Sequence, residues 1–521
     1  MAQPSMTIDE AMREAAQLAS RGDTDRAKHL YNLVLQQQPA HKKAKKALKA
    51  LGSKHSAALS QSDFERVAQL MQQGKLPAAR AEAQRLCRQY PEQPALHNLH
   101  GVILSRQAHK DAALEAFQRA LSLEPTFAEA LNNSASTLTD LGRFSEALRC
   151  YQELVNRGQA DADIYANLAR ALRGSGALEA AREALHRALR LKPVYPDALN
   201  DLGNLLNAMG QHPQAIEAYE NTLQMDPTHR KALLNLARSW SAGSAYAKAI
   251  EQYKKLLALD EGNHHALRGI ANAYLSLGDR DQAQDFFQRL LAVRPEDAVG
   301  THMLAALSGQ ALRSANAAYA EAVFNNFAEN FEQHLTGALE YRLPERIPAL
   351  LETVDGEDAW YSRTLDLGCG TGLVGTQIRS YCDHLSGVDV SPAMLEKAGE
   401  KAVYDDILVG DINRILKEER ESFDLVLCAD VLIYFGELGV LFPDIARRCK
   451  PGARFLLSTE TLAEGDFRLL QSGRFAHSVD YVERCAAAAG FALLHREDIP
   501  LRKEGGEWLR GNVFILALSA H

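Results

Sequence analysis

A glycine-rich turn and several aspartates in the C-terminal third of the chain have the types and spacing of a nucleotide-binding site. The segment TLDLGCGTGLVG (364–375) predicts a buried strand, a glycine-rich turn and the start of a helix. Glycines let a backbone approach a bulky ligand, and the first turn of a helix offers unpaired N–H groups. Gly370, Gly372 and Gly375 also spell the G-x-G-x-x-G pattern of a dinucleotide site. The glycines alone do not decide between ligands.

Two aspartates at later predicted strand ends supply further polar groups. Asp389, in HLSGVDVSPAML (384–395), lies 21 residues after Gly368, at the end of a second predicted strand. A carboxylate there can accept hydrogen bonds from both hydroxyls of a ribose. Asp411 follows a third predicted strand, where it can accept from an adenine amine while Ile412 covers the ring. Each aspartate alone could instead cap the helix that follows it.

Together these segments resemble the motifs of class I S-adenosylmethionine (SAM) dependent methyltransferases, in order and in spacing. Asp366 precedes the glycine turn, where a dinucleotide fold usually keeps an apolar residue, and the resemblance implies that it lies near the methionine amino group of SAM. FDLVLCADVLIYF (423–435) adds a fourth strand with Ala429 and Asp430 at its tip. The resemblance covers about residues 320–521. It implies an α/β Rossmann-like domain with a seven-stranded sheet.

The segment before this domain is rich in aromatic residues. Its apolar side chains recur at spacings of three and four, which by itself indicates one packed face of a helix. They are Phe324, Phe327, Phe331 and Leu335. FNNFAENFE (324–332) resembles the F-D-x-x-A-x-x-Y-D signature that forms a lid over the cofactor in many class I methyltransferases. Asn325 and Glu332 replace the acids of that signature. The cofactor-binding residues implied in full are Asp366, Gly368, Cys369, Gly370, Thr371, Gly372, Asp389, Val390, Asp411, Ile412, Ala429, Asp430, Phe324 and Phe331.

The resemblance also gives candidate catalytic residues. Methyl transfer is an in-line displacement, so a protein base is needed only for an acceptor that arrives protonated. Tyr434 is expected near the transferred methyl group, or else packed beneath the fifth strand. GRFAHSVDYVERCAAAAGF (473–491) resembles a G-R-[FY]-x-H-x-x-x-Y element that we place over the substrate mouth. His477 in it is the first candidate base, with an orienting or helix-capping role as the alternative, and Glu460 is the second candidate.

The N-terminal half carries a repeat with a period of 34 residues. Five prolines lie at multiples of 34 from one another: Pro91, Pro125, Pro193, Pro227 and Pro295. An alanine stands twelve residues before every slot of this grid: Ala79, Ala113, Ala147, Ala181, Ala215, Ala249 and Ala283. A helix–turn–helix unit with a small residue at the helix crossing explains this register. The segment 196–229 closely resembles the tetratricopeptide-repeat (TPR) consensus.

The sequence therefore predicts an all-α TPR superhelix followed by the α/β domain. The parts are out-of-phase TPR-like helices over 1–59, seven repeats over 60–297, capping and lid helices over 298–345, and a SAM-dependent methyltransferase domain over 346–521. This fusion resembles the bacterial group of TPR-containing methyltransferases. The fourth strand is not followed by the (Asn/Asp)-Pro-Pro-(Tyr/Phe) sequence that grips planar amides, which argues against adenine or glutamine N-methylation.

Asparagines recur at equivalent positions of the first helix of the repeats. An amide both donates and accepts, so such a ladder suits an extended peptide whatever its sequence. It resembles the asparagine ladder of O-linked N-acetylglucosamine transferases. The alternative is that these side chains solvate a helix face or bond between neighbouring repeats. The predicted peptide-binding residues are Asn98, Asn132, Asn133, Asn167, Asn200, Asn204, Asn235 and Asn272.

Composition narrows the function classes further. The 521-residue chain is 46% hydrophobic and 24% charged, as in ordinary globular proteins, and its net charge of −8 argues against broad nucleic-acid binding. Its seven cysteines form no CxxC pair, which favours a reducing compartment and gives no zinc-ligand spacing. No apolar stretch reaches the ~18 residues of a membrane helix, and the start lacks signal-peptide features. We expect a cytoplasmic protein with no metal.

These observations predict an enzyme that methylates a protein or peptide recruited through its TPR groove. The alternative is a small-molecule methyltransferase whose TPR domain binds a regulatory or scaffold partner, because the lid signature also occurs in quinone and other small-molecule methyltransferases. A non-catalytic adaptor is a third class, and the complete set of aspartates and glycines at the cofactor site argues against it.

Overall fold

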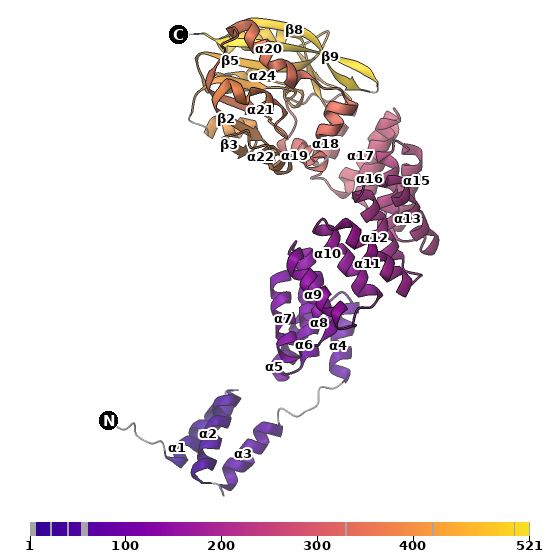
Figure 1. Cartoon of the computed structure of the whole chain (residues 1–521), viewed down its shortest axis with the longest axis vertical. Coiled ribbons are helices and arrows are strands. Elements are labelled where there is room, and N and C mark those ends of the chain that lie inside the picture. The colour runs from indigo at the N-terminus through magenta and orange to yellow at the C-terminus, as the bar shows by residue number, and fades with distance from the viewer. Residues whose placement is uncertain are drawn as a thin grey trace, which may run out of the picture. The chain divides into compact units, whose positions relative to one another are not determined.

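The structure is a computed structural model that describes residues 7–20, 23–38, 41–53, 61–328, 331–418, 421–504 and 506–519 (Figure 1). The chain divides into two compact units, Met1–Ala232 and Leu233–His521. Residues 54–60 and the side chain of Phe327, which the sequence places on the lid helix, lie outside the described residues. In the described ranges, no helix is both long enough and apolar enough to cross a membrane.

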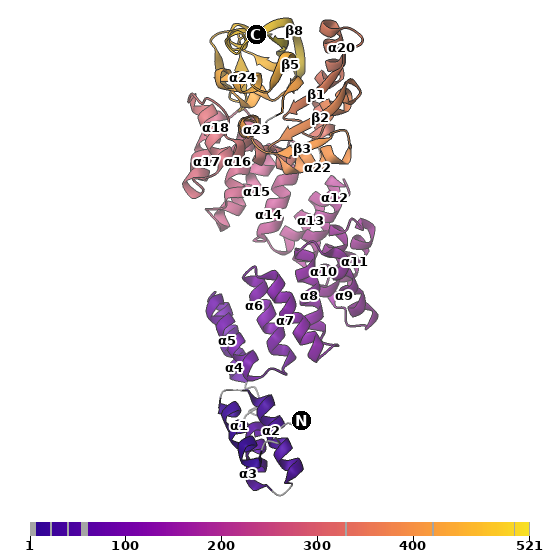
Figure 2. The ribbon, with the colours of Figure 1, turned by 90° about the vertical axis from the view of Figure 1, so that its left-hand side faces the viewer.

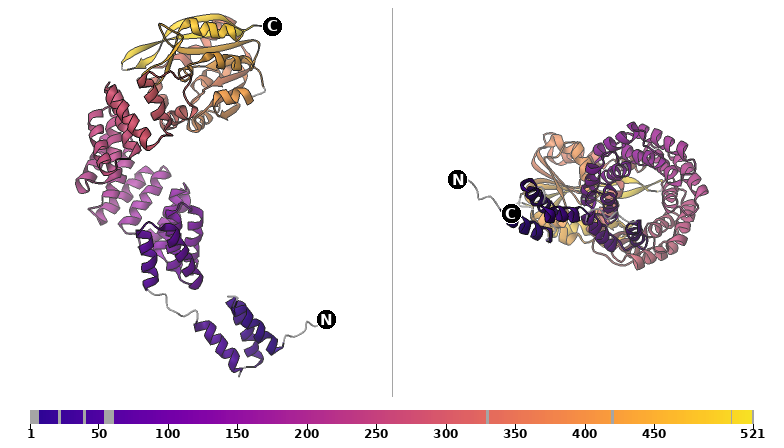
Figure 3. Two further views of the ribbon diagram at one scale, coloured as in Figure 1. Left: turned by 180° about the vertical axis from the view of Figure 1, so that it is seen from behind. Right: turned by 90° about the horizontal axis from the view of Figure 1, so that it is seen from below.

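Every regular element in the described part of the first unit is a helix. From α6 to α12 the first helices of successive pairs start 34 residues apart, as the proline grid predicts. Consecutive helices contact each other from α4 through to α13; Figure 3 shows this part of the ribbon as stacked helices in purple and magenta. The helices are α1 (Ile8–Ser20), α2 (Thr24–Gln37), α3 (Lys42–Ser53), α4 (Gln61–Gln72), α5 (Leu76–Gln89), α6 (Pro94–Arg106), α7 (Lys110–Leu123), α8 (Ala128–Asp140), α9 (Phe144–Asn156), α10 (Ala162–Gly174), α11 (Leu178–Leu191), α12 (Pro196–Ala208) and α13 (His212–Met225).

Close helix crossings explain the small residues of the repeat. All seven alanines of the 34-residue register are fully buried. Opposite them, glycines of the first helix face aromatic rings of the second. A Cβ on Gly101 would lie 2.5 Å from the ring of Phe117, and one on Gly203 would lie 2.5 Å from the ring of Tyr219. The two backbones therefore approach each other as closely as the ring allows.

The second unit begins with further helix pairs and continues into helices that lead to the sheet. The unit boundary falls within helix α14 (Arg230–Ala242), and α18 is the last helix in the 34-residue phase. The others are α15 (Tyr246–Leu259), α16 (His264–Ser276), α17 (Arg280–Val293), α18 (Ala298–Ser308), α19 (Ala317–Phe327), a π-helix (Gln333–Ala338) and α20 (Leu343–Asp355).

A mixed sheet forms the centre of the second unit. Seven strands follow the order β3-β2-β1-β4-β5-β9-β8, with β9 antiparallel to both β5 and β8. Two short strands, β6 and β7, add to the end of β5. The strands are β1 (Tyr361–Leu367), β2 (Cys382–Asp389), β3 (Asp406–Val409), β4 (Phe423–Cys428), β5 (Cys449–Thr461), β6 (Phe467–Leu469), β7 (Phe475–His477), β8 (Phe491–Glu504) and β9 (Glu507–Leu518).

Helices cover both faces of this sheet, so its strands alternate between two apolar cores. One core joins the sheet to α23, α24 and α25, and the other joins it to α20 and α21. On β9, Val513 and Ile515 enter the second core while Phe514 and Leu516 enter the first. Figure 2 shows α22 beside β2 and β3. These helices are α21 (Leu373–Ile378), α22 (Pro392–Glu400), α23 (Ile412–Glu418), α24 (Leu438–Ala446) and α25 (Val479–Ala488).

The predicted fold class, helical repeats followed by an α/β Rossmann-like domain with a seven-stranded sheet, is confirmed by these elements. The sequence did not indicate β6 and β7, because strands of three residues carry too little periodicity to be recognised.

Replacing Gly101 by alanine should destabilise the repeats, because the buried Phe117 ring cannot move away from the new Cβ. Overpacking of this kind costs about 1–3 kcal/mol. The midpoint of urea unfolding, followed by far-UV circular dichroism, should therefore fall. Gly243→Ala is the matched control, since its Cβ would meet nothing closer than 3.6 Å. Equal midpoints for the two variants would contradict the close crossing.

Candidate functional site

A cavity of about 340 Å³ opens at the carboxyl ends of β1, β2 and β4, the edge where open parallel sheets place their ligand sites. Its wall comes from the glycine turn, the ends of β2 and β4, the loop after β3, and the segment from α19 to α20. The predicted residues on this wall are Phe324, Phe331, Gly368, Cys369, Gly370, Thr371, Asp389, Val390, Asp411, Ile412, Ala429, Asp430 and Tyr434. Asp366, Gly372 and His477 are not among the residues that line it.

Asp389 ends β2 on the cavity wall. Its Oδ2 accepts a hydrogen bond from the Gly370 N–H (2.9 Å), and its Oδ1 accepts one from the Ser391 N–H (2.8 Å). Burial raises the pKa of Asp389, and these N–H groups oppose that rise. A carboxylate has more lone pairs than these two bonds use. Asp389 therefore has a fixed position and can still accept from the hydroxyls of a ligand.

Asp411 begins α23 beside the same cavity. Its Oδ1 accepts from the N–H groups of Asn413 (2.8 Å) and Arg414 (3.3 Å), so the helix-capping contact considered as an alternative is present. Ile412 is 9% exposed and also lines the cavity. The loop after β3 thus places an acceptor next to an apolar side chain on the cavity wall.

Asp366 lies beneath the cavity wall. It is 1% exposed, and its Oδ2 accepts a hydrogen bond from the Tyr404 hydroxyl at 2.7 Å. Burial raises the pKa of Asp366 to about 7, against the effect of that bond. The Tyr404 ring lies against Gly372, Gly375 and Gly387, and a Cβ on Gly375 would be 2.4 Å from it. The third glycine of the G-x-G-x-x-G pattern therefore makes room for a tyrosine of the same domain.

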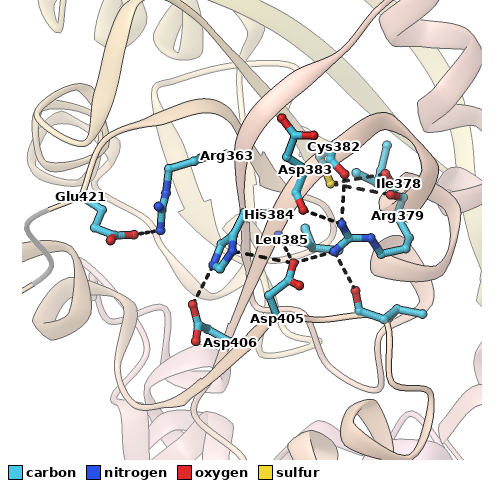
Figure 4. A network of polar contacts seen from close by, with 11 residues as sticks. Arg363, Ile378, Arg379, Cys382, Asp383, His384, Leu385, Asp405, Asp406 and Glu421 are labelled. Atoms are coloured by element: carbon cyan, nitrogen blue, oxygen red, sulfur yellow. Dashed lines mark hydrogen bonds and ion pairs between the residues drawn. The ribbon is translucent and has the colours of Figure 1, made fainter.

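A polar network holds the loop that carries Tyr404 (Figure 4). Arg379 donates to the Val403 carbonyl (3.3 Å), to Asp405 Oδ2 (2.6 Å) and to two carbonyls at the start of β2. Asp405 Oδ2 also accepts from the Leu385 N–H at 2.8 Å. The residues on both sides of Tyr404 are thus bound to Arg379 or to β2, which fixes the loop that carries the Tyr404 hydroxyl.

Two side-chain contacts tie the predicted lid segment to the region around α22. The Ser391 hydroxyl donates to Asn325 Oδ1 at 2.6 Å, and Lys401 Nζ lies 2.5 Å from Glu332 Oε1. Asn325 and Glu332 are the two residues that replace the acids of the lid signature. In this chain they bind the α/β domain.

Aromatic rings form one side of the cavity. The ring of Phe324 meets that of Phe331 edge-on, with centroids 6.0 Å apart, and that of Tyr434 at 5.4 Å. Burial raises the pKa of Tyr434, so its hydroxyl stays protonated at neutral pH. This side of the cavity is therefore lined by apolar ring surface.

Buried charges lie next to that aromatic side. Arg502 donates to both Asp430 and Glu460, and Arg474 Nε donates to Glu460 Oε1 at 2.6 Å. Asp430 and both arginines line the cavity, while Glu460 is 1% exposed behind them. Burial raises the pKa of Glu460, and the two guanidinium groups oppose that rise. Each charged group has an opposite charge beside it, so the cluster is held in place.

The segment between α18 and α19 is bound to the cavity wall by its main chain. The Ala315 N–H donates to the Tyr434 carbonyl (2.8 Å), and the Gly436 N–H donates to the Arg313 carbonyl (2.9 Å). Helix α18 itself contacts the loop after β6, where the His302 ring donates to the Gly473 carbonyl at 2.7 Å. The last helix of the repeat phase is therefore packed on the α/β domain.

His477 lies away from the cavity wall. It is 1% exposed, its Nε2 lies 3.2 Å from the Gly436 carbonyl, and its ring is parallel to that of Tyr481. Burial lowers the pKa of His477 to about 4, so the ring is neutral at pH 7. A general base must reach the proton that it removes. These contacts fit the orienting role, and we do not propose His477 as the general base.

Asparagines of the first unit bond from one repeat to the next. Asn133 Nδ2 donates to Asn98 Oδ1 (3.0 Å), and Asn167 Nδ2 donates to Asn132 Oδ1 (3.3 Å). These are the inter-repeat bonds considered as the alternative to peptide binding. An amide has two donor hydrogens and two lone pairs, so each pair keeps capacity for a ligand. Of the other predicted residues, Asn200 is buried, Asn204 and Asn235 are half-buried and Asn272 is exposed.

Comparison with protein families assigns both parts of the chain. Residues 365–457 match the family described as a methyltransferase domain. The C-terminal part is a methyltransferase domain. Families described as tetratricopeptide repeat match residues 68–126, 109–172, 162–195, 200–264 and 240–307. The predicted combination of TPR repeats with a class I methyltransferase domain is confirmed.

Curated relatives match about a quarter of the chain. A ubiquinone biosynthesis O-methyltransferase of Xylella fastidiosa is 28% identical over 155 residues, which are 26% of this chain and 63% of that protein. One of Hahella chejuensis is 32% identical over 122 residues, 22% of this chain and 51% of that protein. The chain thus spans about three fifths of the length of the first of these relatives.

Solved structures cover only a share of the chain. The Cut9–Hcn1 complex of the APC/C covers 57% of this chain and 55% of its own, at 18% identity and a TM-score of 0.40. The magnesium protoporphyrin IX methyltransferase of Synechocystis with bound SAM covers 34% and 78%, at 18% identity and a TM-score of 0.27. These scores are too low to support any inference about function.

SAM is the cofactor that a class I methyltransferase domain implies, and the cavity fits it. The wall offers the Asp389 carboxylate for hydroxyl groups, and Asp411 with Ile412 for a flat polar ring. The Thr371 hydroxyl is buried on this wall without a hydrogen-bond partner. A buried polar group without a partner is costly, which suits a ligand that supplies one.

Several residues of the site were missed from the sequence. Tyr404 and Arg502 lie far along the chain from the glycine turn, and no motif includes them. Gly375 and Gly387 indicate that a large side chain packs against these positions, since both leave space for a ring. The sequence does not indicate which residue supplies that ring.

Replacing Asp366 by asparagine should change how stability depends on pH. The folded pKa of about 7 lies above the ordinary 3.8, so the folded state binds this proton more tightly than the unfolded state does. Wild-type stability should fall as pH rises from about 4 to about 7, because a buried charge forms. The amide that replaces the carboxyl group in the variant cannot ionise.

The free energy of unfolding of Asp366→Asn, relative to wild type, should therefore rise across this window, by up to about 4 kcal/mol. Urea unfolding at pH 4.5 and pH 8 measures it. Asp383→Asn, an exposed residue of the neighbouring strand, is the control and should show no such trend. A constant difference between Asp366→Asn and wild type would mean that Asp366 does not bury its charge.

Proposed function

We propose that the C-terminal domain is an active class I SAM-dependent methyltransferase. The observation that carries this proposal is Asp389 at the end of β2. Its carboxylate is held by the Gly370 N–H on the wall of a cavity that also contains Asp411 and Ile412. Three strand ends and the glycine turn thus bring a nucleoside-binding set together.

In this proposal each residue has a binding task. Asp389 accepts hydrogen bonds from the ribose hydroxyls, Asp411 accepts from the adenine amine, and Ile412 covers the ring. Phe324 and Phe331 exclude water from the cofactor. SAM supplies a methyl group on a sulfonium, and the chain contributes alignment of the acceptor's lone pair, which can lower a barrier by ~7–11 kcal/mol.

In this proposal the methyl acceptor binds at the side of the cavity that Tyr434 lines. Its ring meets Phe324, and Arg474 and Arg502 line the wall next to it. Tyr434 is a protonated hydroxyl at neutral pH, suited to position an acceptor. An acceptor that arrives deprotonated, or as a neutral amine with a free lone pair, needs no further base.

We further propose that the acceptor belongs to a protein or peptide that the TPR repeats recruit. Support comes from the inter-repeat asparagine pairs, Asn98 with Asn133 and Asn132 with Asn167, which form a regular series of amides along the first unit. Amides at this spacing suit the repeating N–H and C=O groups of an extended chain.

The second candidate is methylation of a small molecule, with the repeats binding a regulatory or scaffold partner. The curated relatives favour it, since they are ubiquinone biosynthesis O-methyltransferases. The enclosing aromatic rings also suit a compact, partly apolar acceptor.

Asp389→Asn should weaken binding of the product S-adenosylhomocysteine (SAH) at least tenfold, because the amide has half the acceptor capacity of the carboxylate. Isothermal titration calorimetry measures it. Asp383→Asn on the same strand is exposed and should bind SAH as wild type does. Wild-type affinity in Asp389→Asn would remove the main support for the proposed site.

The acceptor class is tested with radiolabelled SAM and a cell lysate, resolved by gel electrophoresis and by solvent extraction. We expect label in a discrete protein band, at least fivefold weaker with the Asn132→Ala, Asn133→Ala and Asn167→Ala triple variant. Asn156→Ala, an exposed residue of α9, is the control. Label confined to the extracted fraction, and insensitive to the triple variant, would favour the small-molecule candidate.

A further inference from the structure

A second cavity, of about 760 Å³, lies next to the first one. Its wall comes from the end of α18 with the segment that follows, from β6 with the turn after it, and from residues near the ends of β5, β8 and β9. Arg474 lines both cavities. The second cavity therefore shares a wall with the first, at the side where the methyl acceptor is proposed to bind.

Glu460, near the end of β5, has an unused acceptor atom at this second cavity. Its side chain is 1% exposed and lines the cavity. Glu460 Oε1 accepts from Arg474 Nε at 2.6 Å and also from Arg502, and two guanidinium groups favour the ionised carboxylate. Among the described residues, none donates a hydrogen bond to Glu460 Oε2. A buried acceptor without a donor is unfavourable, so this oxygen points to a ligand that supplies one.

The charges around this carboxylate favour a cationic donor. Arg474 also pairs with Glu504, and Arg502 also pairs with Asp430. The cluster thus contains three carboxylates and two guanidinium groups, so one negative charge has no matching cation within it. Arg468 lines the cavity too, but it is exposed and lies outside the cluster. A ligand that is both a cation and a donor would balance the charge and bind the unused oxygen.

The shape of the ligand follows from the apolar part of the wall. Side chains from three segments form it: Ala306, Leu307, Leu312, Phe467, Leu470 and Leu509. Apolar surface around one carboxylate suits a flexible aliphatic stem that ends in a charged group. A primary ammonium on such a stem, as in lysine, is compact and has three donor hydrogens.

Resting on the proposed function, we infer that the second cavity binds a primary ammonium on an aliphatic stem, carried by the methyl acceptor. The ammonium donates to Glu460 Oε2, and the stem lies along the apolar wall. A lysine side chain of a protein recruited by the repeats is the source that we expect. Glu460 does not line the first cavity. It is thereby a residue that determines acceptor specificity, and the role of general base is not assigned to it.

The first test measures ligand binding to the full chain by isothermal titration calorimetry. The probes are Nα-acetyl-lysine N-methylamide and the matching norleucine compound, which keeps the stem but lacks the amine. The wild-type chain should bind the lysine probe at least tenfold more tightly. Glu460→Gln should reduce this preference to less than twofold, because the amide oxygen is needed by the two arginines and an NH₂ group then replaces Oε2. Glu464→Gln is exposed and outside both cavities, and should behave as wild type.

A second variant leaves the ion pairs of Glu460 unchanged. Ala311 is exposed and lines the second cavity but not the first, so Ala311→Trp would fill part of the second cavity alone. It should weaken the lysine probe at least fivefold and leave the affinity for SAH within twofold of wild type. Ser308→Trp, at an exposed position of α18 that does not line this cavity, is the control.

The radiolabelled lysate assay tests whether the ammonium belongs to the methyl acceptor. Ala311→Trp should reduce the label at least fivefold relative to Ser308→Trp. Loss of label from a protein band assigns the ammonium to a lysine of that protein, and loss from the extracted fraction assigns it to a small molecule. Full labelling by Ala311→Trp would overturn the assignment to the acceptor.

Equal affinity of the wild-type chain for the two probes would overturn the inference, because water would then be a sufficient partner for Glu460 Oε2. An unchanged preference in Glu460→Gln would overturn it as well. Failure of the proposed function is a separate result, in which the wild-type chain does not bind SAH but still prefers the lysine probe.

Discussion

The hydrogen bond from Tyr404 to Asp366 is the contact on which the cavity depends. Asp366 is buried directly before the glycine turn. The Tyr404 hydroxyl donates a hydrogen bond to it, which the Asp366 side chain can accept whether or not it is protonated. Tyr404 reaches it because Gly375 and Gly387 leave space for its ring. Arg379 in turn holds the loop that carries Tyr404. The glycine turn therefore has two surfaces, one that lines the cavity and one that lies against the Tyr404 ring.

The fold could be predicted because it depends on periodic patterns. The regular spacing of prolines and alanines predicted the helix pairs. Short apolar runs that alternate with helical stretches predicted the strands, which contribute side chains to two cores in the structure. The sequence placed Asp389 and Asp411 at one edge of the sheet because each lies at the end of a predicted strand, and parallel strands end at the same edge. Tyr404 and Arg502 could not be placed there, since segments distant in sequence bring them to the cavity and no spacing records that approach.

Residue type also failed to show which way a side chain faces. His477 has the chemistry of a base, yet it is buried away from the cavity wall with its ring against Tyr481. The asparagines have the chemistry of peptide recognition, yet Asn98 and Asn132 first bond to the next repeat. In both cases burial and neighbouring groups, which a single sequence does not record, decide what a polar side chain can reach.

The main-chain hydrogen bonds of Arg313 and Ala315 to the Tyr434 region limit where a gene that joins repeats to this α/β domain can recombine. Recombination that exchanged repeat arrays could cross over among α14 to α17 and still leave the wall intact. A crossover after Ala315 would replace the residues that bind Tyr434 and Gly473, and one side of the cavity would then depend on the incoming sequence. Exchange of repeats is thus expected to preserve this wall only upstream of the last repeat-phase helix.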